Sequence, residues 1–243
     1  MQLDVLAFGA HPDDVELTCA GTIIKLGAKG YKTGVIALTR GEMGTRGTPE
    51  IRQQEFETAG KIMGLTVHKA LDLPDGNVEV NWENKLRVIR EIRQYRPRIV
   101  FAPYWFDRHP DHGHCGRLVR EAVFLAGLKR IDTGQPHFRP AKVIHYPARY
   151  EFTPSFIVDV SDHFDQRMKA VRAYQSQFYR PEAVGEDETF ISRPEFLEAI
   201  ETRAKYWGTH IGAKYGEPFL VVEALRVEDP VELFGEQVGF LGP

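Results

Sequence analysis

Short apolar runs alternate along the chain with longer segments in which apolar residues recur at helical spacing. Residues 3–8 (LDVLAF) are mostly apolar and are followed by Gly9, which is typical of a strand buried on both faces. Further strands are expected at residues 33–38, 67–71, 98–102, 142–146, 156–160 and 219–225. Helices are expected at residues 13–29, 49–63, 83–95, 115–128, 164–171 and 194–206. This alternation predicts an α/β fold, a three-layer sandwich with a mostly parallel, Rossmann-like sheet.

The chain is expected to form one domain over residues 1–243, because it has no internal repeat, low-complexity tract or long Ser/Gly linker. Ligands of such folds bind beyond the carboxyl ends of the strands. The loops after Phe8, Leu38 and Ala102 are therefore the expected place for chemistry. The longest irregular stretch, residues 179–192, is expected to form a lid.

Two similar tetrapeptides follow two of the expected strands. HPDD occupies residues 11–14, after the first strand, and HPDH occupies residues 109–112, after the strand at 98–102. His-Pro-Asp is also a helix-capping pattern, which accounts for the aspartates but not for three histidines. Buried carboxylates are costly unless they are paired, and a cation would remove that cost. Imidazole and carboxylate groups are zinc ligands, so the pair of motifs predicts a divalent metal site.

Spacing selects the ligands. His11 and Asp14 lie three residues apart at the start of a helix, so both can face one point. A catalytic zinc takes three protein ligands and leaves one position open. His112 is the expected third ligand because it begins the next helix, whereas His109 precedes a proline in an extended stretch.

The remaining members of the motifs suit the chemistry beside a metal. Asp13 is expected to act as a general base, and His109 as an electrostatic stabiliser. Asp111 is expected to orient a neighbouring imidazole. His114 is two residues from His112, on a different face of the helix, and is expected to be solvated.

Composition removes several classes of partner. The 243 residues carry 31 Lys plus Arg against 34 Asp plus Glu, a formal net charge of −3, which gives no bulk reason to expect nucleic acid or an anionic membrane. No apolar run is long enough for a membrane span, and no basic region precedes the first apolar run, so a cytoplasmic protein is expected. Cys19 and Cys115 are too few for a disulfide framework.

Local arginines can still attract an anionic substrate. Arg52 and Arg108 flank the expected active-site loops, and the planar arginine fork binds carboxylates through two hydrogen bonds. We expect these two to bind substrate, whereas Arg46 is as well explained by a solvated charge. The glycine-rich residues 40–48 match no phosphate-binding fingerprint, so a nucleotide cofactor is not expected.

Longer stretches carry a family resemblance. The segments AHPDDVELTCAGTI, LTRGEMGTRGT, IRQQE, LDLPDGNV, RHPDHGH, VDVSDHFDQRMKAVRAYQSQF and IGAKYGEPF resemble the LmbE/PIG-L family of zinc-dependent N-acetylglucosamine deacetylases. They look most like its bacillithiol-biosynthesis branch, whose substrate is N-acetylglucosaminyl-malate.

The resemblance implies zinc ligands at His11, Asp14 and His112, a catalytic base at Asp13, and supporting roles for His109 and Asp111. It also implies a homo-oligomer, for instance a hexamer built from trimers. Phe234, Phe240 and Leu241 are candidates for that contact, although a folded-back tail fits them equally well.

Several alternatives stay open. Fe²⁺, Mn²⁺ or Co²⁺ also accept these ligands, and non-haem iron oxygenases use two histidines and a carboxylate, although they would not explain Asp13. The substrate of a deacetylase could be another N-acetyl sugar or a mycothiol-type conjugate, and a metal-dependent sugar-binding protein without catalysis would use the same fold. A serine hydrolase is disfavoured because the chain has no G-x-S-x-G motif.

Overall fold

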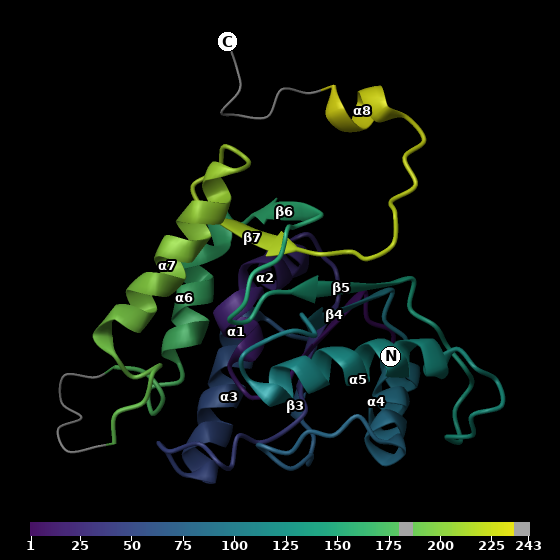
Figure 1. Cartoon of the computed structure of the whole chain (residues 1–243), viewed down its shortest axis with the longest axis horizontal. Coiled ribbons are helices and arrows are strands. Elements are labelled where there is room, and N and C mark those ends of the chain that lie inside the picture. The colour runs from purple at the N-terminus through teal and green to yellow at the C-terminus, as the bar shows by residue number, and fades with distance from the viewer. Residues whose placement is uncertain (180–186, 236–243) are drawn as a thin grey trace.

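Five parallel strands form the central sheet, in the order β3-β2-β1-β4-β5. The computed structural model describes residues 1–179 and 187–235 (Figure 1). The strands are β1 (Val5–Gly9), β2 (Thr33–Ala37), β3 (Val67–Ala70), β4 (Ile99–Pro103) and β5 (Lys142–Tyr146). In register, Val5 of β1 lies between Thr33 of β2 and Ile99 of β4.

Helices cover both faces of this sheet, which confirms the three-layer α/β prediction. Alternate side chains of β1 enter two separate cores, Val5 and Ala7 one of them and Leu6 and Phe8 the other. The first core is closed by α1 (Asp14–Thr18), α2 (Ala20–Ala28), α3 (Pro49–Met63), α6 (Phe164–Arg172) and α7 (Pro194–Thr209). The second is closed by α4 (Trp82–Tyr95) and α5 (Pro110–Ala126).

The expected helix at 13–29 is two helices, broken at Cys19. A buried ion pair fills the break, since Glu217 accepts hydrogen bonds from the backbone N–H groups of Gly21 and Thr22 at 2.9 and 2.7 Å. Its partner Arg167 donates to the carbonyl of Glu16 at the end of α1. The two residues thus replace backbone hydrogen bonds that a continuous helix would make.

The expected strand at 219–225 is wrong in position. The strand is β7 (Gly216–Phe219), which pairs antiparallel with β6 (Phe156–Asp159) in a separate two-stranded sheet. Among the described residues beyond Phe219, only Leu220 makes a further bridge, to His145 of β5. Within the described chain, no strand lies beside residues 222–225, and they are exposed.

Smaller differences concern helix ends. α5 begins at Pro110 rather than near residue 115, so the second tetrapeptide opens this helix. A 3₁₀ turn, Ser161–His163, precedes α6, and a short helix, α8 (Pro230–Phe234), follows β7. Of the expected lid, residues 180–186 lie outside the described chain, as do Phe240 and Leu241. None of the described helices has the length and apolarity needed to cross a membrane.

Candidate metal centre and active site

The strand order brings the two tetrapeptides together. β1 leads into α1 on one face of the sheet and its neighbour β4 leads into α5 on the other, so a crevice opens between their carboxyl ends. The ring centroid of His11 lies 4.8 Å from that of His109 and 5.4 Å from that of His112. The loops after Phe8 and Ala102 therefore meet as the sequence predicts.

His11, Asp14 and His112 each offer one ligand atom, and these atoms lie within 4.8 Å of one another. Asp14 is held in place because its Oδ2 accepts hydrogen bonds from the backbone N–H groups of Ala10 and His11 at 2.8 and 2.9 Å. Its Oδ1 lies 3.1 Å from His112 Nε2. A side chain at Gly9 would place its Cβ 3.0 Å from the Cβ of Asp14, so glycine is needed for this close approach.

The electrostatics of these three residues fit a cation. Burial alone would raise the pKa of Asp14, but the charges of His112 and His11 and their hydrogen bonds hold it well below its usual range. Burial would lower the pKa of His112, but Asp14 and Asp107 raise it to about 9. The negative field that holds a proton on His112 also attracts a metal ion, and two imidazoles with one carboxylate are a suitable ligand set for a divalent one.

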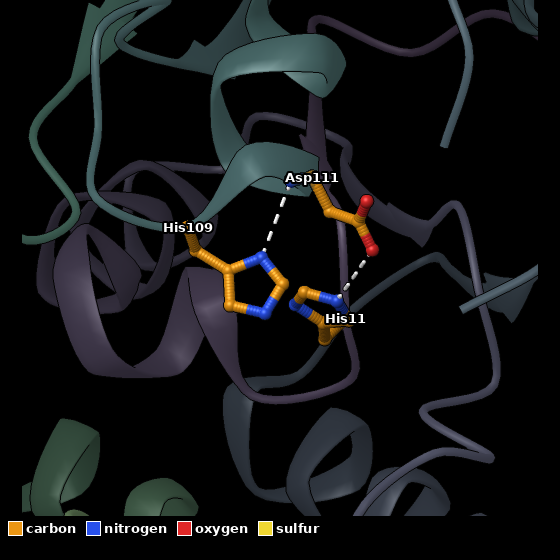
Figure 2. A group of neighbouring side chains, drawn as sticks. All are labelled: His11, His109 and Asp111. Carbon is orange, nitrogen blue, oxygen red and sulfur yellow. Dashed lines mark hydrogen bonds and ion pairs between the residues drawn. The ribbon is translucent and has the colours of Figure 1, made fainter. Parts of the chain in front are cut away.

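A second group joins His11, His109 and Asp111, shown in Figure 2. Asp111 is fixed by backbone N–H groups of Gly76 and Val78 at 2.8 and 3.1 Å, and its Oδ2 lies 3.3 Å from His11 Nε2. Asp111 thus contacts an imidazole, as expected for an orienting carboxylate.

His109 caps the N-terminus of α5 and faces the crevice. Its Nδ1 accepts a hydrogen bond from the backbone N–H of Asp111 at 3.2 Å, so in the neutral ring the proton sits on Nε2. Burial, together with the charges of His11 and His112, lowers the pKa of His109. The ring stacks on His112 with centroids 4.8 Å apart.

Asp13 occupies a strained position beside the candidate metal ligands. Its φ of 104° is rare for a residue with a side chain, and such strain is found at functional sites. Burial and then the neighbouring Asp14 carboxylate raise the pKa of Asp13 to about 7, against the opposing charge of Arg52. A carboxyl group with a pKa near 7 exchanges protons readily at neutral pH.

The arginines near the expected active-site loops differ in burial. Arg52 is buried, and its guanidinium donates to the carbonyl of Gly41 while its charge acts on Asp13. A Cβ at Gly41 would overlap this guanidinium, so the glycine-rich loop wraps closely around it. Arg46 is buried as well rather than solvated.

Arg108 is exposed and lines a cavity of about 570 Å³ that begins at Asp14 and His112. The guanidinium carbons of Arg108 and Arg149 lie 5.4 and 5.2 Å from the centre of the Phe190 ring. The cavity continues between α1, α6 and α7, where apolar residues such as Phe196 and Trp207 line it.

Sequence reasoning missed three residues of this site. Asp107, directly before the second motif, places Oδ1 2.9 Å from His112 Nδ1 and accepts hydrogen bonds from the backbone N–H groups of Arg149 and Tyr150. Asp75, within the segment LDLPDGNV, places Oδ1 3.0 Å from His11 Nε2. Arg149 carries no motif that marks it.

One expectation for the neighbouring histidines changes. His114 is half-buried rather than solvated, because its Nδ1 lies 2.6 Å from the carbonyl oxygen of Val78. This carbonyl belongs to residues 76–78, and the backbone N–H groups of Gly76 and Val78 also donate to Asp111.

Comparisons with known proteins agree with this arrangement. Residues 6–123 match the family model described as PIG-L, GlcNAc-PI de-N-acetylase, and this span includes both tetrapeptides. The chain is 33% identical over 230 residues to the diacetylchitobiose deacetylase of Thermococcus kodakarensis, covering 88% of this chain and 80% of that protein. It is 28% identical over 187 residues to the probable N-acetyl-alpha-D-glucosaminyl L-malate deacetylase 2 of Bacillus anthracis, covering 72% and 81%. The crystal structure of a conserved protein from Thermus thermophilus superposes with a TM-score of 0.85 at 41% identity, covering 93% and 98%.

Proposed function

This chain belongs to the PIG-L family of de-N-acetylases, also called LmbE-like, and we propose that it hydrolyses the acetamide of an N-acetylglucosamine conjugate to acetate and the free amine. The observation that carries the proposal is the meeting of His11, Asp14 and His112 at one point, with Asp13 adjacent. We propose Zn²⁺ as the metal, although these ligands also accept Fe²⁺, Mn²⁺ or Co²⁺.

A zinc ion held by His11, Asp14 and His112 would polarise the acetamide carbonyl and lower the pKa of the attacking water. Asp13 takes up the proton of that water, since its carboxyl is buried and its pKa is near neutral. His109 faces the same crevice with Nε2–H and stabilises the negative charge that develops on the carbonyl oxygen.

The amine nitrogen must receive a proton before its bond to carbon breaks. Two groups of the site can deliver it. Asp13 holds the proton taken from water, and His109 carries one on Nε2. Substitution of His109 separates these routes: if an imidazolium at His109 donates the proton, the variant loses the alkaline limb of the pH–rate profile. If Asp13 donates it, that limb is unchanged, because Asp13 must be ionised at the start to act as the base.

We propose N-acetylglucosaminyl-malate, the bacillithiol precursor, as the substrate. Arg108 and Arg149 line the cavity that begins at the candidate metal ligands, and arginines suit a conjugate with two carboxylates. The 28% identity to a probable malate-conjugate deacetylase supports this choice. Diacetylchitobiose is the second candidate, favoured by the 33% identity to an enzyme named for that substrate.

Acetate release from a substrate panel tests the proposal. The panel contains N-acetylglucosaminyl-malate, N,N'-diacetylchitobiose, N-acetylglucosamine and an N-acetylglucosaminyl-inositol, each assayed with and without added zinc. We expect the highest kcat/KM for the malate conjugate. A higher kcat/KM for N,N'-diacetylchitobiose would make that sugar the substrate in place of the malate conjugate. If no member of the panel released acetate, the deacetylase function would be overturned.

Substitution of the base gives a separate prediction. Asp13→Asn keeps the size of the side chain but cannot accept the proton, so kcat should fall about 10²- to 10⁴-fold. Zinc content, measured by mass spectrometry of metals, should stay at the wild-type level because Asp13 is not among the grouped ligands. Asp72→Asn, at an exposed carboxyl, is the matched control. A near-normal kcat in Asp13→Asn would remove Asp13 from the reaction.

A further inference from the structure

The segment after β7 leaves the body of the protein as an exposed arm. We define the C-terminal arm as residues 222–235, all of which are exposed. In Figure 1 it departs beside β5, and α8 lies apart from the other described elements. Val231 and Phe234 of α8 are 75% and 73% exposed. A helix this short is not stable alone in water, and an apolar face so exposed marks a surface that binds a partner.

A groove of about 640 Å³ lies between α5 and the edge strand β5. We call it the α5/β5 groove. Its lining combines apolar and basic side chains, and Phe124 is 58% exposed there. The residues that matter here are Val123, Phe124, Val143, Arg120, Arg139 and Lys142.

The arm and the groove have complementary charge. Over residues 222–235 the arm carries Glu223, Glu228, Asp229 and Glu232 against a single arginine, Arg226. The groove has three basic side chains, with Glu121 as the acidic residue contributed by α5. The acidic, apolar arm therefore matches the basic, apolar groove both in charge and in hydrophobic surface.

The first two residues of the arm show where it leaves the groove of its own chain. Val222 and Glu223 line the α5/β5 groove of their own chain, and Lys142 Nζ lies 3.6 Å from a carboxylate oxygen of Glu223. The rest of the arm then turns away from α5 and β5 (Figure 1). Two copies placed groove to groove about a two-fold axis would bring each arm beside the groove of the other copy.

We propose that the C-terminal arm of one copy occupies the α5/β5 groove of a second copy, and that the exchange is reciprocal. Each groove then covers the apolar side chains of the partner's α8. Arg139 and Lys142 face the partner's acidic residues. The contact is isologous, so the assembly contains an even number of copies.

Charge reversal tests the pairing. The arm variant Glu228→Lys/Glu232→Lys leaves Asp229 unchanged, because Asp229 caps α8. The groove variant is Arg139→Glu/Lys142→Glu. Sedimentation velocity on the full chain should show an even-numbered particle for the wild type and a mass of half or less for each variant. Glu57→Lys/Glu83→Lys, at exposed sites on α3 and α4, has the same change of charge as the arm variant and should keep the wild-type mass.

Mixing the two variants distinguishes exchange from a folded-back arm. In an equimolar mixture the reversed arm meets the reversed groove, and the unchanged arm meets the unchanged groove, so the wild-type mass should return. A folded-back arm would give no association on mixing. The proposal is overturned by a single-copy wild type, by variants that keep the wild-type mass, or by a mixture that stays dissociated.

Folding is checked separately. None of the four substituted positions lies in the candidate metal centre, so the melting temperature of each chain and its acetate release identify a variant that has lost its fold. If the groove variant melts early, Lys142→Glu alone replaces it, with Glu232→Lys as its partner in the mixture.

Discussion

Asp107 connects the candidate metal centre to the loop that carries the exposed Arg149. One carboxylate oxygen faces His112 Nδ1 at 2.9 Å, and the other accepts backbone N–H groups of Arg149 and Tyr150 at 2.6 and 3.0 Å. Burial opposes ionisation of Asp107, but these hydrogen bonds keep its pKa well below the usual range. Asp107 therefore stays ionised and fixes which nitrogen of His112 points at the metal site.

Asp107→Asn should weaken both metal binding and turnover. The amide keeps the shape but removes the charge that orients and polarises His112, and loss of such a partner costs about 10- to 100-fold in metal affinity or activity. Zinc affinity by competition with a chelator and kcat/KM for acetate release measure the two effects. Asp132→Asn, in an exposed turn, is the control. Unchanged zinc affinity would show that Asp107 does not orient the ligand.

The sequence predicts the residues of the site that lie within a motif and misses those that meet only in the fold. His11, Asp14 and His112 come together because their spacing and the ends of β1 and β4 determine their placement. Asp75 reaches His11 from a loop whose path no local pattern specifies. Arg149 is positioned by Asp107 through its backbone, an interaction that does not depend on the type of residue at position 149.

At the scale of elements, the break between α1 and α2 depends on residues far along the chain. Glu217 of β7 is 1% exposed and binds the first N–H groups of α2, the Thr22 hydroxyl and Arg167 of α6. A carboxylate at a helix N-terminus is favoured by the unpaired N–H groups and by the helix dipole. This pair therefore ties β7 and α6 to the helices that follow β1.

Glu217→Gln should destabilise the fold by about 3 kcal/mol, because it leaves the buried Arg167 without its counter-charge. Urea unfolding followed by circular dichroism measures the free energy of unfolding. Glu223→Gln, at an exposed carboxylate nearby, should change it by less than about 1 kcal/mol. Equal stabilities of Glu217→Gln and wild type would mean that the ion pair contributes nothing beyond its desolvation cost.

The periodicity of apolar residues predicts most helices and strands, but it does not predict the break between α1 and α2 or the end of β7. Apolar spacing from residue 13 to 29 is continuous, and the interruption at Cys19 comes from Glu217 and Arg167 rather than from a local breaker. The apolar residues among 222–225 likewise resemble the continuation of a strand, but in the described chain they begin an exposed arm that leaves the sheet.

At the scale of the whole molecule, a buried histidine links global stability to pH. His68 of β3 packs against Phe56 of α3 with ring centroids 3.5 Å apart, and burial lowers its pKa to about 4. Both ring nitrogens lack hydrogen-bond partners among the described residues. Its usual value is 6.5, so the unfolded chain binds a proton at a pH where the folded protein does not.

Above pH 6.5 the His68 ring is neutral in both the folded and the unfolded chain. As the pH falls from 6.5 toward 4, the unfolded chain takes up the proton and the folded protein does not, so the free energy of unfolding decreases. Between pH 7 and pH 5 the free energy of unfolding of the wild type should fall by about 2 kcal/mol more than that of His68→Leu, which cannot titrate. Comparing the two proteins cancels the pH dependence of groups that do not contact His68. Urea unfolding at both pH values measures the difference, with exposed His137→Leu as the control. An equal fall in wild type and His68→Leu would show that His68 is protonated in the folded protein as readily as in the unfolded chain.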